Sequence, residues 1–154
     1  MKSGSPMLNN KWRYLQINFM TITEQSLGLD VANIFFEATE CLLEQIQRSE
    51  LMTNNARWLD LGGGSGDFSY IANERGISCV SLDNSRVCNL LGAKPVLADA
   101  HWLPFKDACL DLVRCLNIFE TSLYQFNFER ICFELSRVLK TNGVVIIQGF
   151  YPPS

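Results

Sequence analysis

Residues 57–69 read Arg-Trp-Leu-Asp-Leu-Gly-Gly-Gly-Ser-Gly-Asp-Phe-Ser, and this stretch decides the fold. The alternating bulky apolar residues before the glycines predict a short buried strand, and the glycines predict a tight turn into a helix that starts near Asp67. Glycine suits such a turn because a Cβ would hold a ligand away from the backbone, and because glycine adopts positive φ freely. The helix offers free N–H groups at its start. The stretch therefore predicts a nucleotide-binding turn.

The spacing of the glycines separates two classes of ligand. The dinucleotide fingerprint Gly-x-Gly-x-x-Gly would need its third glycine where this chain has Asp67 or Ser69, so neither register fits. The chain has a carboxylate followed by three glycines at alternate positions, namely Asp60, Gly62, Gly64 and Gly66. Asp67 stands where a pyrophosphate would sit. The pattern favours a ligand without phosphate that carries a cationic amino group, and a structural glycine turn in an ordinary α/β protein is the alternative.

This stretch closely resembles the first motif of class I S-adenosylmethionine-dependent methyltransferases, in which an acidic residue precedes Gly-x-Gly-x-Gly. The resemblance implies S-adenosylmethionine as the cofactor, with Asp60 and the three alternate glycines among its binding residues.

The composition narrows the class of protein. A length of 154 residues predicts one domain, and 47% apolar with 19% charged residues is ordinary for a soluble globular protein. A net charge of -3 and scattered Lys and Arg residues disfavour a nucleic acid substrate. The sequence has no apolar run of membrane-spanning length and no signal-peptide core at its start, so we expect a cytoplasmic protein without membrane contact.

The six cysteines predict neither disulfides nor a metal site. No two have the Cys-x-x-Cys spacing, and the only histidine is His101. Most cysteines stand at apolar positions of expected strands or helices, where a free cysteine behaves as a small hydrophobe. We expect the cysteines to be reduced core residues, and we expect no zinc site.

An N-terminal arm and helices are expected over residues 1–55, and a cofactor-binding core over residues 56–150. The first ten residues have the composition of a loose tail. Residues 11–23 carry aromatic and aliphatic side chains without a clean period, which leaves open a helix or an arm that packs over something. Residues 30–47 have the apolar spacing of a helix that packs on the sheet.

A carboxylate follows the second strand of this core. Residues 67–75 predict a helix that ends at Gly76, and residues 77–82 predict a strand that ends in Asp83. The stretch from Asp60 to Asp83 has the length of one βαβ unit in which the acidic residue after the second strand binds a ribose diol. Asp83 is therefore predicted to bind ribose, and a cap on a short helix at residues 85–91 is the alternative.

The loop after a third strand resembles the methyltransferase segment that binds adenine. Residues 99–105 read Asp-Ala-His-Trp-Leu-Pro-Phe. The resemblance implies that the Asp99 carboxylate takes the exocyclic amine of adenine while the backbone N–H of Ala100 meets a ring nitrogen. Trp102 or Leu103 would form an apolar wall beside the ring. The alternative is a loop with no ligand.

No catalytic residue can be named from the sequence. Residues 107–115 predict a turn and a fourth strand that resembles the next motif of the family, which implies that the residues at its end line the methionine part of the cofactor. These residues are Cys115, Leu116 and Asn117. Relatives often continue with a histidine that this chain lacks. His101 is expected to pack or hydrogen-bond beside Asp99 and not to act as a general base.

The last segment predicts a helix and a buried strand. Residues 127–140 have helical apolar spacing, residues 141–143 would cap that helix, and residues 144–147 predict the strand. Residues 135–143 closely resemble the Arg-Val-Leu-Lys-Pro-Gly-Gly segment of small-molecule methyltransferases related to those of quinone biosynthesis. Together the motifs imply an open, doubly wound, mostly parallel α/β sheet of the Rossmann-like methyltransferase type, with the cofactor at the carboxyl ends of the first strands.

The leading function is methyl transfer from S-adenosylmethionine to a small-molecule acceptor, whose identity the sequence does not indicate. A non-catalytic S-adenosylmethionine-binding or partner protein with an incomplete methyltransferase fold is the alternative. The glycine spacing disfavours a nicotinamide-dependent oxidoreductase.

Relatives normally continue past the fifth strand with a helix and an antiparallel strand pair, whereas this chain ends at Ser154. We therefore expect a fold truncated after the fifth strand, with one edge of the strand at residues 144–147 uncovered. The chain is then expected to be a fragment of a longer enzyme or the partner of another chain, its own copy included, that covers this edge.

Overall fold

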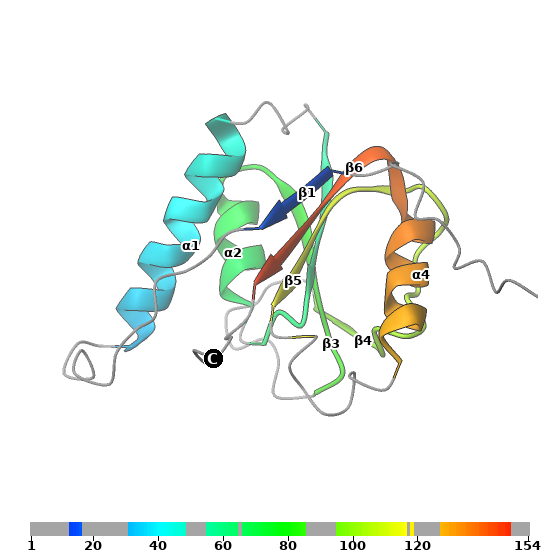
Figure 1. Ribbon diagram of the computed structural model, residues 1–154. Helices are drawn as coiled ribbons and strands as arrows, with labels where there is room; N and C mark the ends of the chain where they lie inside the picture. Colours follow the sequence, from blue (N-terminus) through cyan, green and yellow to red (C-terminus); the bar gives the residue numbers. More distant parts are fainter. Residues whose placement is uncertain are drawn as a thin grey trace, which may run out of the picture.

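The computed structural model describes residues 13–16, 31–48, 55–64, 66–85, 95–116, 118 and 127–148. The elements within them are shown in Figure 1. The strands are β1 (Arg13–Gln16), β2 (Arg57–Leu61), β3 (Ser78–Asp83), β4 (Pro95–Leu97), β5 (Leu110–Leu116) and β6 (Leu139–Gln148). The helices are α1 (Val31–Arg48), α2 (Asp67–Glu74) and α4 (Phe128–Val138).

All described strands lie in one sheet, in the order β1-β6-β5-β2-β3-β4, and every neighbouring pair is parallel. From β2 the chain proceeds to β3 and β4 on one side, and it then returns to β5 and β6 on the other side. The strand order therefore reverses between β2 and β5, and ligands of open α/β sheets bind at such a point. This arrangement confirms the open, doubly wound α/β sheet.

Helices cover both faces of the sheet (Figure 1). On one face, Leu42 of α1 and Phe68 of α2 share a core with Trp58 of β2. On the other face, Ile131 of α4 shares a core with Leu59 of β2. Successive residues of β2 thus enter different cores, because side chains alternate between the two faces of a strand. Burial on both faces explains why this strand is apolar along most of its length.

The last helix and strand differ from the prediction. Helix α4 ends at Val138, and Leu139 is already extended, with φ -75° and ψ 139°. Strand β6 begins there, so residues 141–143 lie inside the strand and do not cap the helix. The pairing of β6 with β5 shifts register between Leu110 and Leu112, which accommodates these extra residues in a bulge. Most of the predicted helix at residues 85–91, and the predicted N-terminal tail, lie outside the described residues.

Strand β1 corrects the expectation of an uncovered edge. Arg13–Gln16 pairs in parallel with residues 144–147 of β6, so this edge is covered within the chain. Of the two alternatives for residues 11–23, an arm that packs on another part of the chain is correct for the four residues of β1. A partner chain on this side of the sheet stays a prediction, and it would have to meet β1.

The described cysteines are free thiols, as predicted. Cys79 and Cys115 lie in the core, and burial raises the pKa of both thiols. Cys41 is exposed, so it is not a core residue, and Cys88 lies outside the described residues.

Within the described part of the chain, no helix combines the length and the apolar character that a membrane span requires. The same residues contain no group of three or more His, Cys, Asp or Glu side chains placed to hold a metal ion.

Gly143 has no room for a side chain, so we expect Gly143→Ala to destabilise the fold. A Cβ here would lie 2.9 Å from Leu139 Cδ2 and from the carbonyl oxygen of Lys140. Relief of these contacts should lower the free energy of unfolding, measured in urea, by about 1–3 kcal/mol. Thr141→Ala, at an exposed position of the same bulge, should change it by less than about 0.5 kcal/mol. Equal stabilities of the two variants would show that the bulge relaxes freely.

Candidate functional site

Backbone hydrogen bonds fix the glycine turn to the end of β3. The N–H groups of Gly62 and Gly63 both donate to the carbonyl oxygen of Leu82, at 2.8 and 3.4 Å. The φ angles of Gly62, Gly64 and Gly66 are +74°, +53° and +85°, which is the left-handed region that favours glycine. A Cβ on Gly64 would meet no atom of the described residues within 4 Å, so these residues leave open space beside the turn here.

Asp83 joins the glycine turn to the end of β3. Its Oδ2 accepts a hydrogen bond from the N–H of Gly64 at 3.1 Å, and its Oδ1 accepts one from the N–H of Ser85 at 3.0 Å. The carboxylate therefore binds the backbone of the residues that follow it and also faces the glycine turn. Most of the helix that it was alternatively predicted to cap lies outside the described residues. Each ionised oxygen keeps a second lone pair, so Asp83 remains able to accept hydrogen bonds from the hydroxyls of a ribose.

The loop after β4 lies beside Asp83. The N–H of Ala98 donates to the carbonyl oxygen of Asp83 at 3.0 Å. The Asp99 side chain is half-exposed, whereas Ala100 is buried. Because β2, β3 and β4 are parallel neighbours, their carboxyl ends lie side by side. The glycine turn, Asp83 and this loop therefore meet there. The structure thus brings these predicted binding residues together.

Asp60 occupies a different place from the other predicted site residues. Its side chain is fully buried, and its Oδ1 meets Arg114 Nη1 at 2.7 Å. The two residues are cross-strand neighbours on β2 and β5, and the Arg114 guanidinium lies 4.6 Å from the centroid of the Phe68 ring. Burial raises the pKa of the Asp60 carboxyl, and Arg114 opposes this rise. Asp60 therefore lies beneath the turn and not on its open side.

Gly63 packs directly against the buried Asp60 side chain. A Cβ on Gly63 would lie 2.2 Å from Ser81 Oγ and 2.6 Å from Asp60 Oδ2, so only glycine allows the turn to pack here. Ser81 is the cross-strand neighbour of Asp60 on β3. The sequence prediction missed Gly63, Ser81 and Arg114. The one available signal was a basic residue, Arg114, inside the mostly apolar strand β5.

The Cys115 side chain does not face the glycine turn. It is fully buried in the core on the α4 face of the sheet. Its predicted role toward the cofactor stays a prediction for the backbone at the end of β5. Leu116 is described only as part of the strand, and Asn117 lies outside the described residues.

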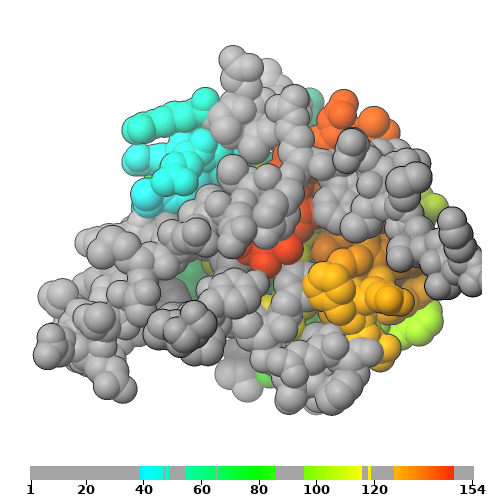
Figure 2. Space-filling view, in the orientation of Figure 1, coloured from blue at the N-terminus to red at the C-terminus, as the bar shows by residue number. Residues whose placement is uncertain are grey.

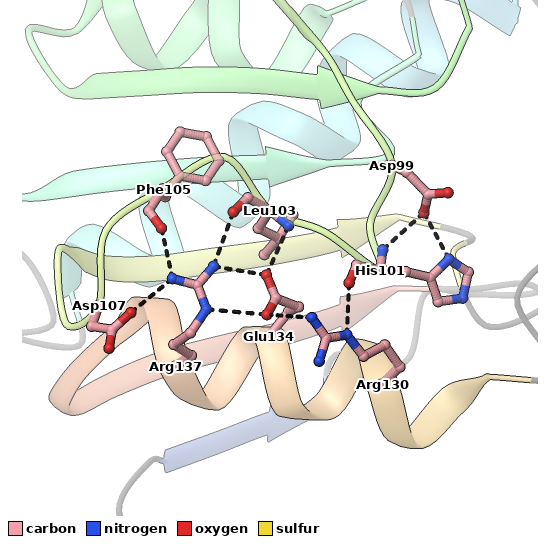
Figure 3. A network of polar contacts seen from close by, with 8 residues as sticks. All are labelled: Asp99, His101, Leu103, Phe105, Asp107, Arg130, Glu134 and Arg137. Atoms are coloured by element: carbon pink, nitrogen blue, oxygen red, sulfur yellow. Dashed lines mark hydrogen bonds and ion pairs between the residues drawn. The ribbon is translucent and has the colours of Figure 1, made fainter.

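Helix α4 holds the loop of residues 101–107 through an ion-pair network (Figure 3). Arg137 donates to the carbonyl oxygens of Leu103 and Phe105 at 2.9 and 2.7 Å, and to Asp107 Oδ1 at 2.8 Å. Glu134 Oε2 accepts from the N–H of Leu103 at 2.8 Å and from Arg137 Nη2 at 2.7 Å. These contacts fix the backbone that follows Asp99.

The two predicted apolar wall residues have different environments. Leu103 is buried in the core on the α4 face. Trp102 is 67% exposed, and its ring lies 3.9 Å from the guanidinium of Arg130. Figure 2 shows part of α4, in orange, at the surface of the molecule. Trp102 therefore keeps exposed apolar area close to Asp99, whereas Leu103 belongs to the core.

The comparisons with known proteins assign the family. The model of the methyltransferase domain family matches residues 59–147, more than half of the chain. The chain therefore belongs to this family. A search of curated proteins finds no match.

Solved structures agree in fold. The PH0226 protein of Pyrococcus horikoshii OT3 is 22% identical, with a TM-score of 0.60 over 79% of this chain and 56% of its own. A SAM-dependent methyltransferase of Archaeoglobus fulgidus is 21% identical, with a TM-score of 0.53 over 75% and 57%. The [4+2]-cyclase SpnF is 21% identical, with a TM-score of 0.54 over 68% and 43%. The chain thus spans about half the length of these structures.

The match to the methyltransferase domain family confirms the predicted cofactor, S-adenosylmethionine. The described residues fit this ligand, because Gly64 leaves open space beside an acidic residue that follows the second strand of the core.

Arg114→Met should leave the buried Asp60 carboxylate without its cationic partner. We expect the free energy of unfolding, measured in urea, to fall by about 3–5 kcal/mol, which is typical when one partner of a buried ion pair is removed. The double variant Asp60→Asn with Arg114→Met should recover part of this loss, because no uncompensated charge remains. A single variant as stable as the wild type would show that Asp60 does not depend on Arg114.

Glu134 should make the stability depend on pH in acid. Arg137, and then the N–H of Leu103, hold the pKa of Glu134 below its ordinary value of 4.5. The contribution of Glu134 to folding stability is therefore complete when the pH is above its ordinary pKa. This contribution is lost as the pH falls through the lower pKa of the folded state. We expect Glu134→Gln to lose about 3 kcal/mol at pH 7, and the gap to the wild type to shrink in acid. Glu44→Gln, in an exposed pair with Arg48, is the control and should change stability little. A stability difference between Glu134→Gln and the wild type that does not change with pH would contradict this prediction.

Proposed function

We propose that this chain is the cofactor-binding part of an S-adenosylmethionine-dependent methyltransferase that acts on a small-molecule acceptor. One observation supports this most strongly: the Asp83 carboxylate lies 3.1 Å from the N–H of Gly64, at the open side of a glycine turn. An acceptor of nucleotide hydroxyls and an accessible backbone turn are thus held side by side at the carboxyl ends of β3 and β2, next to the point between β2 and β5 where the strand order reverses.

Each predicted binding residue except Cys115 has a role in this proposal. Asp83 would take the ribose diol, since two neighbouring hydroxyls can share one carboxylate. The turn from Gly62 to Gly66 would lie against the methionine part, with Asp60 and Arg114 supporting it from below. Asp99 and the backbone of Ala100 would hold adenine. Among the described residues, none accepts a hydrogen bond from the backbone N–H of Ala100, so this donor is available to a ring nitrogen.

The chemistry needs few groups from the chain. When bound, S-adenosylmethionine supplies an electrophilic methyl group on a sulfonium. The protein then has to hold an acceptor atom in line with that methyl, and orientation alone supplies much of the acceleration. A small molecule is favoured because the chain is acidic and has no basic patch in its sequence. The resemblance of residues 135–143 supports the group related to quinone biosynthesis.

A non-catalytic cofactor-binding protein is the second candidate. The likeness to a protein described as a [4+2]-cyclase shows that this fold is not confined to proteins named as methyltransferases, so the fold by itself does not establish methyl transfer. Titration calorimetry with S-adenosylmethionine and with NAD tests the proposed cofactor. A methyl-transfer assay with a panel of small acceptors then separates the two candidates. Tight binding with no turnover on any acceptor would favour the second.

Asp83→Ala should weaken S-adenosylmethionine binding by at least about 1 kcal/mol, because hydrogen bonds to a charged acceptor are lost. The fold should persist, since the side chain lies at a strand end and not in the core. Calorimetric titration measures the affinity, and circular dichroism checks the fold. Glu44→Ala, on the exposed side of α1, should bind normally. Wild-type affinity in a folded Asp83→Ala protein would remove this residue from the site.

A further inference from the structure

The Asp99 carboxylate uses only one oxygen within the described part of the chain. Oδ1 accepts a hydrogen bond from the backbone N–H of His101 at 2.8 Å, and it contacts Nδ1 of the same residue at 2.7 Å (Figure 3). Oδ2 has no hydrogen-bond partner among the described residues, and 53% of the side chain is exposed. The two contacts with His101 occupy the lone pairs of Oδ1, so Oδ2 is the oxygen left for a ligand.

The contact between Asp99 Oδ1 and Nδ1 of His101 also defines the role of His101. An ionised carboxylate only accepts hydrogen bonds, so Nδ1 of His101 is the donor and carries the hydrogen. The His101 side chain is only 13% exposed, which restricts its rotation. His101 therefore determines which way the Asp99 carboxylate turns.

Arg130 of α4 anchors His101 in turn. Its Nε donates to the carbonyl oxygen of His101 at 2.9 Å. Its guanidinium lies 3.9 Å from the centroid of the Trp102 ring and 5.1 Å from that of Phe133. Its Nη2 also meets Glu134 Oε1 at 3.3 Å. A planar cation held by two rings and two acceptors has little freedom, so it fixes the backbone of the loop.

We propose that His101 is a positioning residue that makes the site selective for an aminopurine, with Arg130 as its anchor. His101 turns Asp99 so that Oδ2 accepts a hydrogen bond from the exocyclic amine of adenine. A purine with an oxygen at that position would place one acceptor against another and is disfavoured. This inference rests on the proposed function, because it assumes an adenosyl ligand.

The test compares the affinities for S-adenosylhomocysteine and S-inosylhomocysteine, which differ at that one group, by calorimetry. The wild type should prefer the adenosyl ligand by about tenfold or more. His101→Phe should reduce the preference below about threefold. His101→Asn, whose amide can donate from near the Nδ1 position, should retain most of it. A folded His101→Phe protein with the full preference would overturn the inference.

Arg130→Met gives a second variant, in which a smaller part of the preference should be lost. Arg48→Met, at an exposed position of α1, is the matched control and should keep the preference. An unchanged preference in Arg130→Met would show that Arg130 does not anchor His101.

A measurement on the wild type needs no substitution. His101 is the only histidine, so the imidazole nitrogen signals in a ¹⁵N NMR spectrum belong to it alone. At neutral pH they should show the form with hydrogen on Nδ1, and they should shift when S-adenosylhomocysteine binds. A main form with hydrogen only on Nε2 would overturn the inference. A wild type that binds no adenosyl ligand would refute the proposed function itself, whereas unaltered selectivity in His101→Phe would refute only the inference.

Discussion

A buried ion pair joins the two central strands at the point where the strand order reverses. Asp60 of β2 and Arg114 of β5 meet at 2.7 Å, and Asp60 is fully buried. Buried charges are tolerated only when they are paired, so each residue constrains the position of the other strand end. Gly63 packs against Asp60 so closely that there is no room for a Cβ. The shape of the glycine turn, and the placement of whatever binds against it, therefore depend on this pair.

The candidate site is supported from opposite faces of the sheet. The glycine turn rests on Asp60 and Arg114, on the face that α1 and α2 cover. The loop after β4 is held by Glu134 and Arg137 of α4, which covers the other face. The two supports share no residue. The geometry between the turn and the loop is then set by the sheet that joins them.

Local sequence patterns predicted the parts of this site that local chemistry decides. The glycine spacing, the βαβ length and the acidic residue at the end of β3 are readable because each depends on a few neighbouring residues. The partner of Asp60 was not readable, because it depends on the register between β2 and β5. The end of α4 was misjudged for a related reason: Asn142 has the positive φ of +67° that is typical of a helix end, but it lies in a bulge within strand β6.

The pairing of β1 with β6 constrains the order in which the sheet can form. Arg13 pairs with Val144, so the first described strand to leave the ribosome pairs with the last. At about 5–20 residues per second, β1 would wait on the order of ten seconds for its partner during synthesis. The central pairs of β2 with β3 and β5 can form in that time, whereas the closing contact cannot. The outermost strand can therefore join the sheet only after the chain has been made as far as β6.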